Sequence, residues 1–303
     1  MKKVLSIALA SLLAAGALVG CGGQGTSSQG GSSSSEASSE ASFKTSSAIT
    51  VIARDSASGT RSAFHELMGI TQKQDGKTVD NLVVGALEFD GTDKVITAVE
   101  GDPYAIGYIS LGSVSDRIKA AKVDGVAPSS ETVKDGSYPV ARPFLLVTKG
   151  EENELVKDFL AYIASVEGQE TVTSKHYISA EESPTPYTGS GKSGTIKLAG
   201  STSVEPLMQV LTEGYRKVNP GVTFEIQAQG SSQGIKAAMD GTFDIGMSSR
   251  ELTEEEAAAL NKHTIAMDGI AVIVNKENPV ENFASKDLTS IYTGEVTTWD
   301  EVK

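Results

Sequence analysis

The chain has 303 residues and a formal net charge of −13, from 39 Asp and Glu against 26 Lys and Arg. It contains no block of basic residues, so its composition argues against a nucleic-acid partner. A single cysteine excludes an intrachain disulfide. Because an acidic surface repels anions at long range, an anionic ligand would have to be held by local dipoles and charges.

The first residues have the pattern of a bacterial export signal. Residues 1–3 are basic at Lys2 and Lys3, and residues 4–19 are apolar but too short to span a membrane as an ordinary helix. The apolar run ends at Cys21 in a sequence that resembles a lipobox. We expect a signal peptide over residues 1–20 and lipid on the Cys21 sulfur, which would anchor the protein to the outer face of the cell membrane. The alternative is a plain secretory signal with an incidental cysteine.

A tether is predicted after the signal. Residues 21–47 are rich in Ser and Gly, so they cannot bury a core and are expected to be disordered. A flexible coil of this length reaches about 25–30 Å. The folded part is then about residues 48–303, which is enough for two compact lobes.

The folded part opens with a strand, a turn and a helix. Residues 49–52 are β-branched and apolar, and residues 61–68 have helical spacing. Ser58, Gly59 and Thr60 lie between them, at a predicted helix N-terminus whose free N–H groups can bind an anion. Arg54 adds a permanent positive charge at the end of the strand.

Strand and helix patterns alternate along the rest of the chain. Strands are predicted at residues 105–109, 142–147, 195–199, 223–229, 244–247 and 270–274, and helices at 92–100, 151–166, 204–218, 235–239, 253–261 and 285–292. Residues 179–194 are rich in Ser, Pro, Thr and Gly and are predicted to be a linker. This alternation predicts an α/β fold with mostly parallel sheets.

Three further turns place hydroxyl side chains where a predicted strand ends. The residues are Thr202 and Ser203 in the first turn, Ser231 in the second and Ser249 in the third. Taken singly, such residues are ordinary helix caps. Capping boxes are indicated at Thr202 with Glu205 and at Thr253 with Glu256. Their repetition beside glycines, together with the nearby charge of Arg54, favours an anion site over capping alone.

Other motifs offer alternatives. Residues 189–194 formally contain GxGxxG, but they precede a strand, which is the reverse of a nucleotide-binding context. Residues 230–234 match the hydrolase motif GxSxG, which makes a serine esterase or phosphatase using Ser232 the rival hypothesis. His263 is the histidine downstream of Ser232, as a triad would require, and it lies in a polar stretch. A surface adhesin is a third hypothesis. No Cys/His cluster or EF-hand pattern supports a metal site, and no cofactor is expected.

Several ordered motifs together resemble the phosphate-binding proteins of phosphate ABC transporters. The resemblance covers residues 48–303, and it is carried by residues 54–61, 105–109, 142–144, 200–207, 230–236 and 244–250. It implies a two-lobed, periplasmic-binding-protein-like clamshell of type II that closes on one phosphate, is not an enzyme, and delivers the phosphate to a membrane permease. A monomer is expected.

The resemblance also implies a ligand set. Carried over by position, the phosphate-binding residues are Arg54, Ser58, Gly59, Thr60, Thr202, Ser203, Ser231 and Ser249. Some family members carry Asp at the positions of Ser249 and Ser56. A serine can still accept a hydrogen bond from a protonated phosphate, because a hydroxyl both donates and accepts. These two departures leave open how phosphate is distinguished from sulfate.

The order of the two halves differs from that of the family. The half containing residues 200–299 normally comes first, whereas here it follows residues 48–172. We therefore expect a circular permutation, which exposed chain ends tolerate. One lobe would hold residues 139–269, including the linker, and the other would hold 48–138 with 270–303, so that the strand at Ile49 lies close to Lys303. The alternative is a fragment of a longer or tandem chain.

Overall fold

A mixed β-sheet organises the folded chain. The computed structural model describes residues 43–74 and 77–302, so predictions about Cys21 and Lys303 concern residues outside the described ones. The main strands are β1 (Thr50–Arg54), β4 (Leu87–Phe89), β5 (Ala105–Ser110), β8 (Ala141–Thr148), β10 (Ser193–Gly200), β11 (Gly221–Ala228), β12 (Ile245–Ser248) and β13 (Asn261–Val274). Shorter strands are β2 (Thr71–Gln74), β3 (Lys77–Asp80), β6 (Lys119–Ala120), β7 (Lys122–Val123), β9 (Ile178–Ser179) and β14 (Asn282–Phe283).

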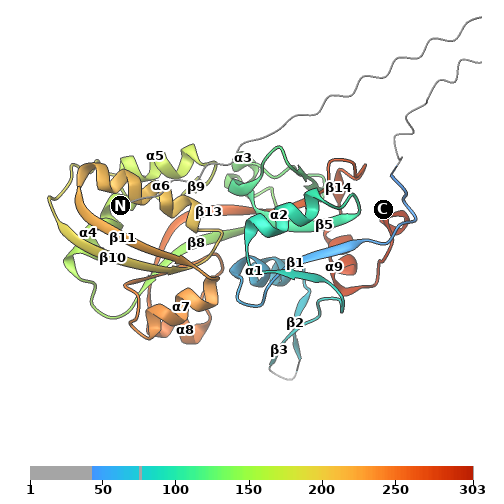
Figure 1. The fold of residues 1–303 in the computed structure, drawn as a ribbon, viewed down its shortest axis with the longest axis horizontal. Helices are drawn as coiled ribbons and strands as arrows, with labels where there is room; N and C mark the ends of the chain where they lie inside the picture. The colour runs from blue at the N-terminus through green and yellow to red at the C-terminus, as the bar shows by residue number, and fades with distance from the viewer. Residues whose placement is uncertain (1–42, 75–76, 303) are drawn as a thin grey trace, which may run out of the picture. The chain divides into compact units, whose positions relative to one another are not determined.

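Helices connect these strands (Figure 1). They are α1 (Gly59–Leu67), α2 (Thr92–Glu100), α3 (Ser130–Lys134), α4 (Glu154–Ile163), α5 (Val166–Ser174), α6 (Glu205–Val218), α7 (Ser231–Met239), α8 (Glu254–Ala259) and α9 (Ser285–Thr293), with 3-10 turns at Leu111–Ser113 and Trp299–Glu301. The helix predicted over residues 151–166 is observed as α4, which ends at Ile163. The following helix, α5, was not predicted, and the Ser165 side chain caps it by accepting a hydrogen bond from the Gly168 N–H.

The strand order is β11-β10-β12-β8-β13-β5-β1-β4. The three strands β11, β10 and β12 are parallel, and so are β5, β1 and β4. In the middle, β8 runs antiparallel to β12, and β13 runs antiparallel to both β8 and β5. The prediction of mostly parallel sheets is therefore correct at both edges of the sheet and wrong at its centre.

Strand β13 belongs to both halves of this sheet. Its residues 261–269 pair with β8, and its residues 270–274 pair with β5. The residue pattern predicts a strand only over the second part, because residues 261–264 are polar. Figure 1 shows this long strand between β8 and the elements around β5.

Two main groups of apolar residues form the core. One contains Phe64, Tyr108, Ile270 and Trp299, and the other contains Phe144, Phe159, Leu207 and Met247. The first group draws on residues from the beginning and the end of the chain, and the second on its middle. This is an α/β fold, and the grouping of its core is consistent with a two-lobed clamshell.

The two ends of the described chain are paired. The Ile49 N–H donates to the Thr297 carbonyl at 2.8 Å, and Ala48 forms a bridge with Thr298. Residues 43–47, which were predicted to belong to the tether, include a packed side chain, because Phe43 lies against Tyr104 and Trp299 with ring centroids 5.0 and 5.8 Å away. An aromatic ring thus fixes residues that the Ser-rich composition assigned to the tether.

Candidate functional site

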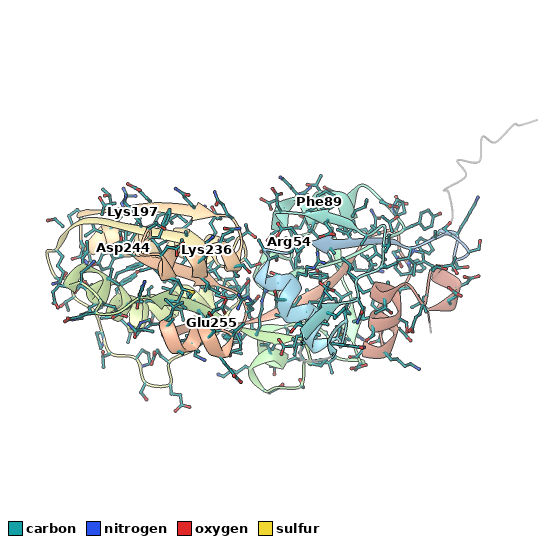
Figure 2. The ribbon with its side chains drawn as sticks, turned by 90° about the horizontal axis from the view of Figure 1, so that it is seen from below. Arg54, Phe89, Lys197, Lys236, Asp244 and Glu255 are labelled. Carbon is teal, nitrogen blue, oxygen red and sulfur yellow. The ribbon has the colours of Figure 1, made fainter. Side chains whose placement is uncertain are left out.

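The Arg54 side chain is buried at the carboxyl end of β1. Only 2% of the residue is exposed. Its Nε donates to the Phe89 carbonyl at 3.1 Å, and its Nη2 donates to Thr202 Oγ1 at 2.9 Å. Figure 2 shows Arg54 beside Phe89, where the neighbouring strands β1 and β4 end.

No carboxylate lies within ion-pair distance of Arg54 among residues 43–74 and 77–302. The adjacent Asp55 instead accepts a hydrogen bond from the Ala57 N–H at 2.8 Å. Burial lowers the pKa of the Arg54 guanidinium, and the field of Asp55 only partly opposes this effect. A buried charge without a counterion is costly in free energy. The site therefore favours an anion at this guanidinium.

Hydroxyl groups from distant segments converge beside Arg54. Thr60 and Ser203 share a hydrogen bond of 2.8 Å across 143 residues. Ser201 donates to Ser249 Oγ at 2.8 Å, and Ser231 Oγ lies 3.3 Å from the same oxygen. Each of these residues is buried. Since a hydroxyl can donate and accept, the cluster can exchange its internal bonds for bonds to an oxyanion.

Two glycines allow the backbone to approach this cluster closely. A Cβ on Gly59 would lie 2.3 Å from Ser231 Oγ and 2.8 Å from Ser249 Oγ. A Cβ on Gly230 would lie 2.7 Å from the Ala57 carbonyl oxygen, and its φ of +103° itself favours glycine. Only residues without a Cβ bring the start of α1 this close to the start of α7.

Three helices begin at the cluster. The first residues of α1, α6 and α7 are Gly59, Glu205 and Ser231, and the free N–H groups of such ends carry a partial positive charge. Neither α6 nor α7 has a side-chain cap. The predicted capping box at Thr202 and Glu205 is therefore wrong.

Other hydroxyls cap these turns. Ser201 Oγ accepts hydrogen bonds from the N–H groups of Ser203 and Val204 at 3.2 and 3.3 Å, which leaves the Thr202 side chain to bind Arg54. Ser58 Oγ accepts from the Arg61 N–H at 3.3 Å, so this predicted site residue also caps α1. The capping box predicted at Thr253 and Glu256 is confirmed.

A buried ion pair supports the turn that carries Ser249. Arg142 donates from Nε and Nη2 to Asp268 Oδ2 at 3.1 and 2.9 Å, and from Nη1 to the Ser249 carbonyl at 3.2 Å. Ser110 donates to the other oxygen of Asp268 at 2.9 Å. These residues join β8, β13 and β5 at the place where β13 changes its partner.

Three residues of this region, Ser201, Arg142 and Asp268, are not among the site residues predicted from the sequence. Ser201 lies in a predicted turn beside Thr202, so its place in that motif was a usable signal. The pairing of Arg142 with Asp268 spans 126 residues and has no local pattern.

The contacts that a Ser232 hydrolase would need are not observed among the described residues. His263 binds Glu152 at 2.6 Å, and within the described ranges no hydrogen bond joins Ser232 to a histidine. Over the same residues, no group of three or more His, Cys, Asp or Glu side chains is placed to hold a metal ion. None of the described helices is both long and apolar enough to cross a membrane.

Comparison with known proteins agrees with the fold and with the motifs. A family model described as a PBP superfamily domain matches residues 36–167 and 185–303. Phosphate-binding protein PstS 2 of Streptococcus pneumoniae serotype 4 is 43% identical over 302 residues, covering 100% of this chain and 99% of that protein. PstS 2 of Streptococcus agalactiae serotype V is 41% identical, covering 99% and 98%.

A solved structure is similar as well. The crystal structure of a phosphate-binding protein of a phosphate ABC transporter from S. pneumoniae TIGR4 matches with a TM-score of 0.71 and 45% identity, covering 85% of this chain and 100% of that one. The identity extends over the whole length of the curated relatives, and the fold agrees with the solved structure. The chain therefore belongs to the family of phosphate-binding proteins, within the PBP superfamily.

Proposed function

We propose that this protein captures inorganic phosphate and delivers it to the membrane permease of an ABC transporter. The observation that carries the proposal is the buried guanidinium of Arg54, which faces hydroxyl groups and has no carboxylate partner among the described residues. A buried arginine that only stabilises the fold is expected to pair with a carboxylate, as Arg142 pairs with Asp268. The phosphate ABC transporter named for the similar solved structure supports the same assignment.

The charges near the cluster suit a phosphate. Each helix N-terminus contributes about half a positive charge, so α1, α6 and α7 together with Arg54 offer roughly +2.5. A phosphate group carries about −1.5 to −2 near neutral pH. This local attraction can offset the repulsion by a chain whose formal net charge is −13.

The proposed ligand set keeps the residues predicted from the sequence: Arg54, Ser58, Gly59, Thr60, Thr202, Ser203, Ser231 and Ser249. Arg54 supplies charge, and the backbone of Gly59 supplies a donor at the start of α1. Ser249 supplies the acceptor for a proton on the phosphate, because its Oγ already accepts from Ser201. A fully deprotonated sulfate has no proton to donate to that acceptor.

The family and the sequence support proposals on catalysis, location, membrane anchoring and oligomeric state. We propose a non-enzymatic, extracytoplasmic protein that is held at the membrane by lipid on Cys21 and acts as a monomer. The exchanged order of the two halves also stays a proposal. The bond between Ile49 and Thr297 supports it, because chain ends that lie together are what a permutation requires.

Titration calorimetry tests the proposal. The purified protein should bind one phosphate per chain, with heat release and a rise in unfolding temperature at millimolar phosphate. Sulfate should bind more weakly. No heat and no thermal shift with phosphate would overturn the proposed function, and hydrolysis of an aryl ester or phosphomonoester would favour the Ser232 hydrolase instead.

A further inference from the structure

A buried chain of hydrogen bonds leads from the surface to the backbone of Arg54. The Arg54 N–H donates to Tyr108 Oη at 3.2 Å, and Tyr108 Oη lies 3.2 Å from His65 Nε2. His65 Nδ1 lies 2.9 Å from Asp80 Oδ1. Both His65 and Tyr108 are buried, whereas the Asp80 side chain is 34% exposed.

The chemistry of these groups fixes the direction of each bond. An ionised carboxylate only accepts, so His65 Nδ1–H donates to Asp80. The Arg54 N–H can only donate, so Tyr108 Oη accepts from it. The Tyr108 hydroxyl proton then points to Nε2, which can accept it only while the imidazole is neutral.

The same cluster also holds the carbonyl of Arg54. Arg61 Nη1 donates to that carbonyl at 2.9 Å, while Arg61 Nε donates to Asp80 Oδ2 at 2.9 Å. Asp80 thus binds Arg61 through one oxygen and His65 through the other. Both Arg61 and His65 belong to α1, whose first residue Gly59 lies at the hydroxyl cluster.

We propose that His65 and Tyr108, which are bonded to Asp80, are positioning residues for anion binding. They fix the position of the Arg54 peptide relative to the start of α1. This inference rests on the proposed function. Tyr108 reaches the proposed ligand set by its hydrogen bond with the Arg54 N–H, so both residues act through the Arg54 backbone. The stacked rings of Phe64 and Tyr108, with centroids 4.2 Å apart, keep the tyrosine in place.

Protonation of His65 would disrupt this arrangement. An imidazolium presents Nε2–H to Tyr108 Oη, which already faces the Arg54 N–H, and the tyrosine proton loses its acceptor. The charged or titratable groups that face His65 are Arg61 on its own helix, Asp80 on β3, Glu88 on β4, Tyr108 on β5 and Tyr292 on α9. Burial lowers the pKa of His65, and the field of Asp80 only partly offsets this.

Three variants test the positioning role in the full protein. Tyr108→Phe removes the hydroxyl but keeps the ring, and it should weaken phosphate binding roughly two- to tenfold at about pH 8, as expected for one lost hydrogen bond. Tyr138→Phe is the matched control, because its hydroxyl is also buried in the same core group and donates to the Ile270 carbonyl. It should leave the phosphate Kd within about twofold of wild type.

His65→Gln tests the pH dependence. As the pH falls from about 8 through the lowered pKa of His65, the wild type should lose more phosphate affinity than His65→Gln, because only the wild type also loses a neutral imidazole. Phosphate itself titrates equally in both proteins, so the difference between the two profiles isolates His65.

The outcomes separate the two proposals. If wild type does not bind phosphate, the proposed function fails. If wild type binds, but Tyr108→Phe matches Tyr138→Phe or the two pH profiles are parallel, the positioning role is overturned. Should Tyr108→Phe not fold, Asp80→Asn at the exposed end of the chain of bonds replaces it, with the same expected loss of affinity and unchanged affinity as the refuting result.

Discussion

Arg54 Nη2 and Thr202 Oγ1 form a hydrogen bond of 2.9 Å although 148 residues separate them in the chain. The bond joins the end of β1 to the turn before α6. A second hydrogen bond, between the hydroxyls of Thr60 at the start of α1 and Ser203, reaches the same turn. These two bonds join parts of the site that are remote in sequence, and changes on either side of them should affect ligand binding.

Gly59→Ala should weaken phosphate binding. The new Cβ would lie 2.3 Å from Ser231 Oγ, so the start of α1 must move away from α7. Calorimetry should show at least about a tenfold increase in Kd, corresponding to about 1.4 kcal/mol. Gly91→Ala is the control, because its Cβ meets nothing closer than 3.9 Å. Equal Kd values for the two variants would refute this close contact.

Ser249 should determine the preference for phosphate over sulfate. An unpaired buried polar group costs roughly 1–3 kcal/mol, so one acceptor for the phosphate proton could give on the order of ten- to hundredfold preference. Ser249→Ala should weaken phosphate more than sulfate, and Ser249→Asp should widen the gap. Competition titrations of the two anions measure both ratios. An unchanged ratio with lowered stability would mean that Ser249 only supports its turn.

Arg142→Met should destabilise the protein strongly. It would leave Asp268 buried without its partner, and removing one member of a buried pair costs roughly 3–5 kcal/mol. Urea unfolding of the single variant and of Arg142→Met with Asp268→Leu provides the measurement. The double variant should recover most of the loss, because it removes both charges. A single variant as stable as wild type would contradict the structural role of this pair.

Stability should fall on acidification in two steps. The pKa of His65 is lowered, chiefly by burial, so its contribution is fully present above the unfolded value of about 6.5 and is lost as the pH falls below it. Although burial opposes the effect, His65 and Arg61 hold the pKa of Asp80 below its ordinary value. The contribution of Asp80 to stability is lost at lower pH, as the pH falls below the ordinary Asp value of 3.8. The free energy of unfolding, measured between about pH 8 and pH 5, should decline less in His65→Gln, and an equal decline would exclude the first step.

The sequence predicted those parts of the fold that have a local signal. The helix over residues 92–100 is observed with the same bounds, because its apolar residues follow helical spacing and Gly residues flank it. The hairpin of β2 and β3 was not predicted, since its strands carry no apolar alternation. The antiparallel course of β13 depends on its partners β8 and β5, which periodicity cannot identify.

The site residues also differ in whether the local sequence predicts them. Arg54, Thr60, Ser203 and Ser231 lie in or beside turns with recognisable residue patterns. In the structure Arg54 bonds to Thr202, Thr60 to Ser203 and Ser231 to Ser249. The Arg142–Asp268 pair and the Tyr108–His65 contact lie on separate elements. Such long-range pairs become visible only after the sheet has placed their strands side by side.

We propose that a bound phosphate balances the charge of Arg54. This can be tested by comparing phosphate affinity and ligand-free stability in wild type and Arg54→Met, with Arg117→Met as a control that removes an exposed, paired charge. Losing a charge-assisted bond should weaken phosphate binding of Arg54→Met at least about tenfold, and sulfate with it. The ligand-free stability of Arg54→Met should be unchanged or higher, because the variant no longer buries an unpaired charge. Phosphate binding by Arg54→Met equal to that of Arg117→Met, together with a loss of ligand-free stability, would contradict the account.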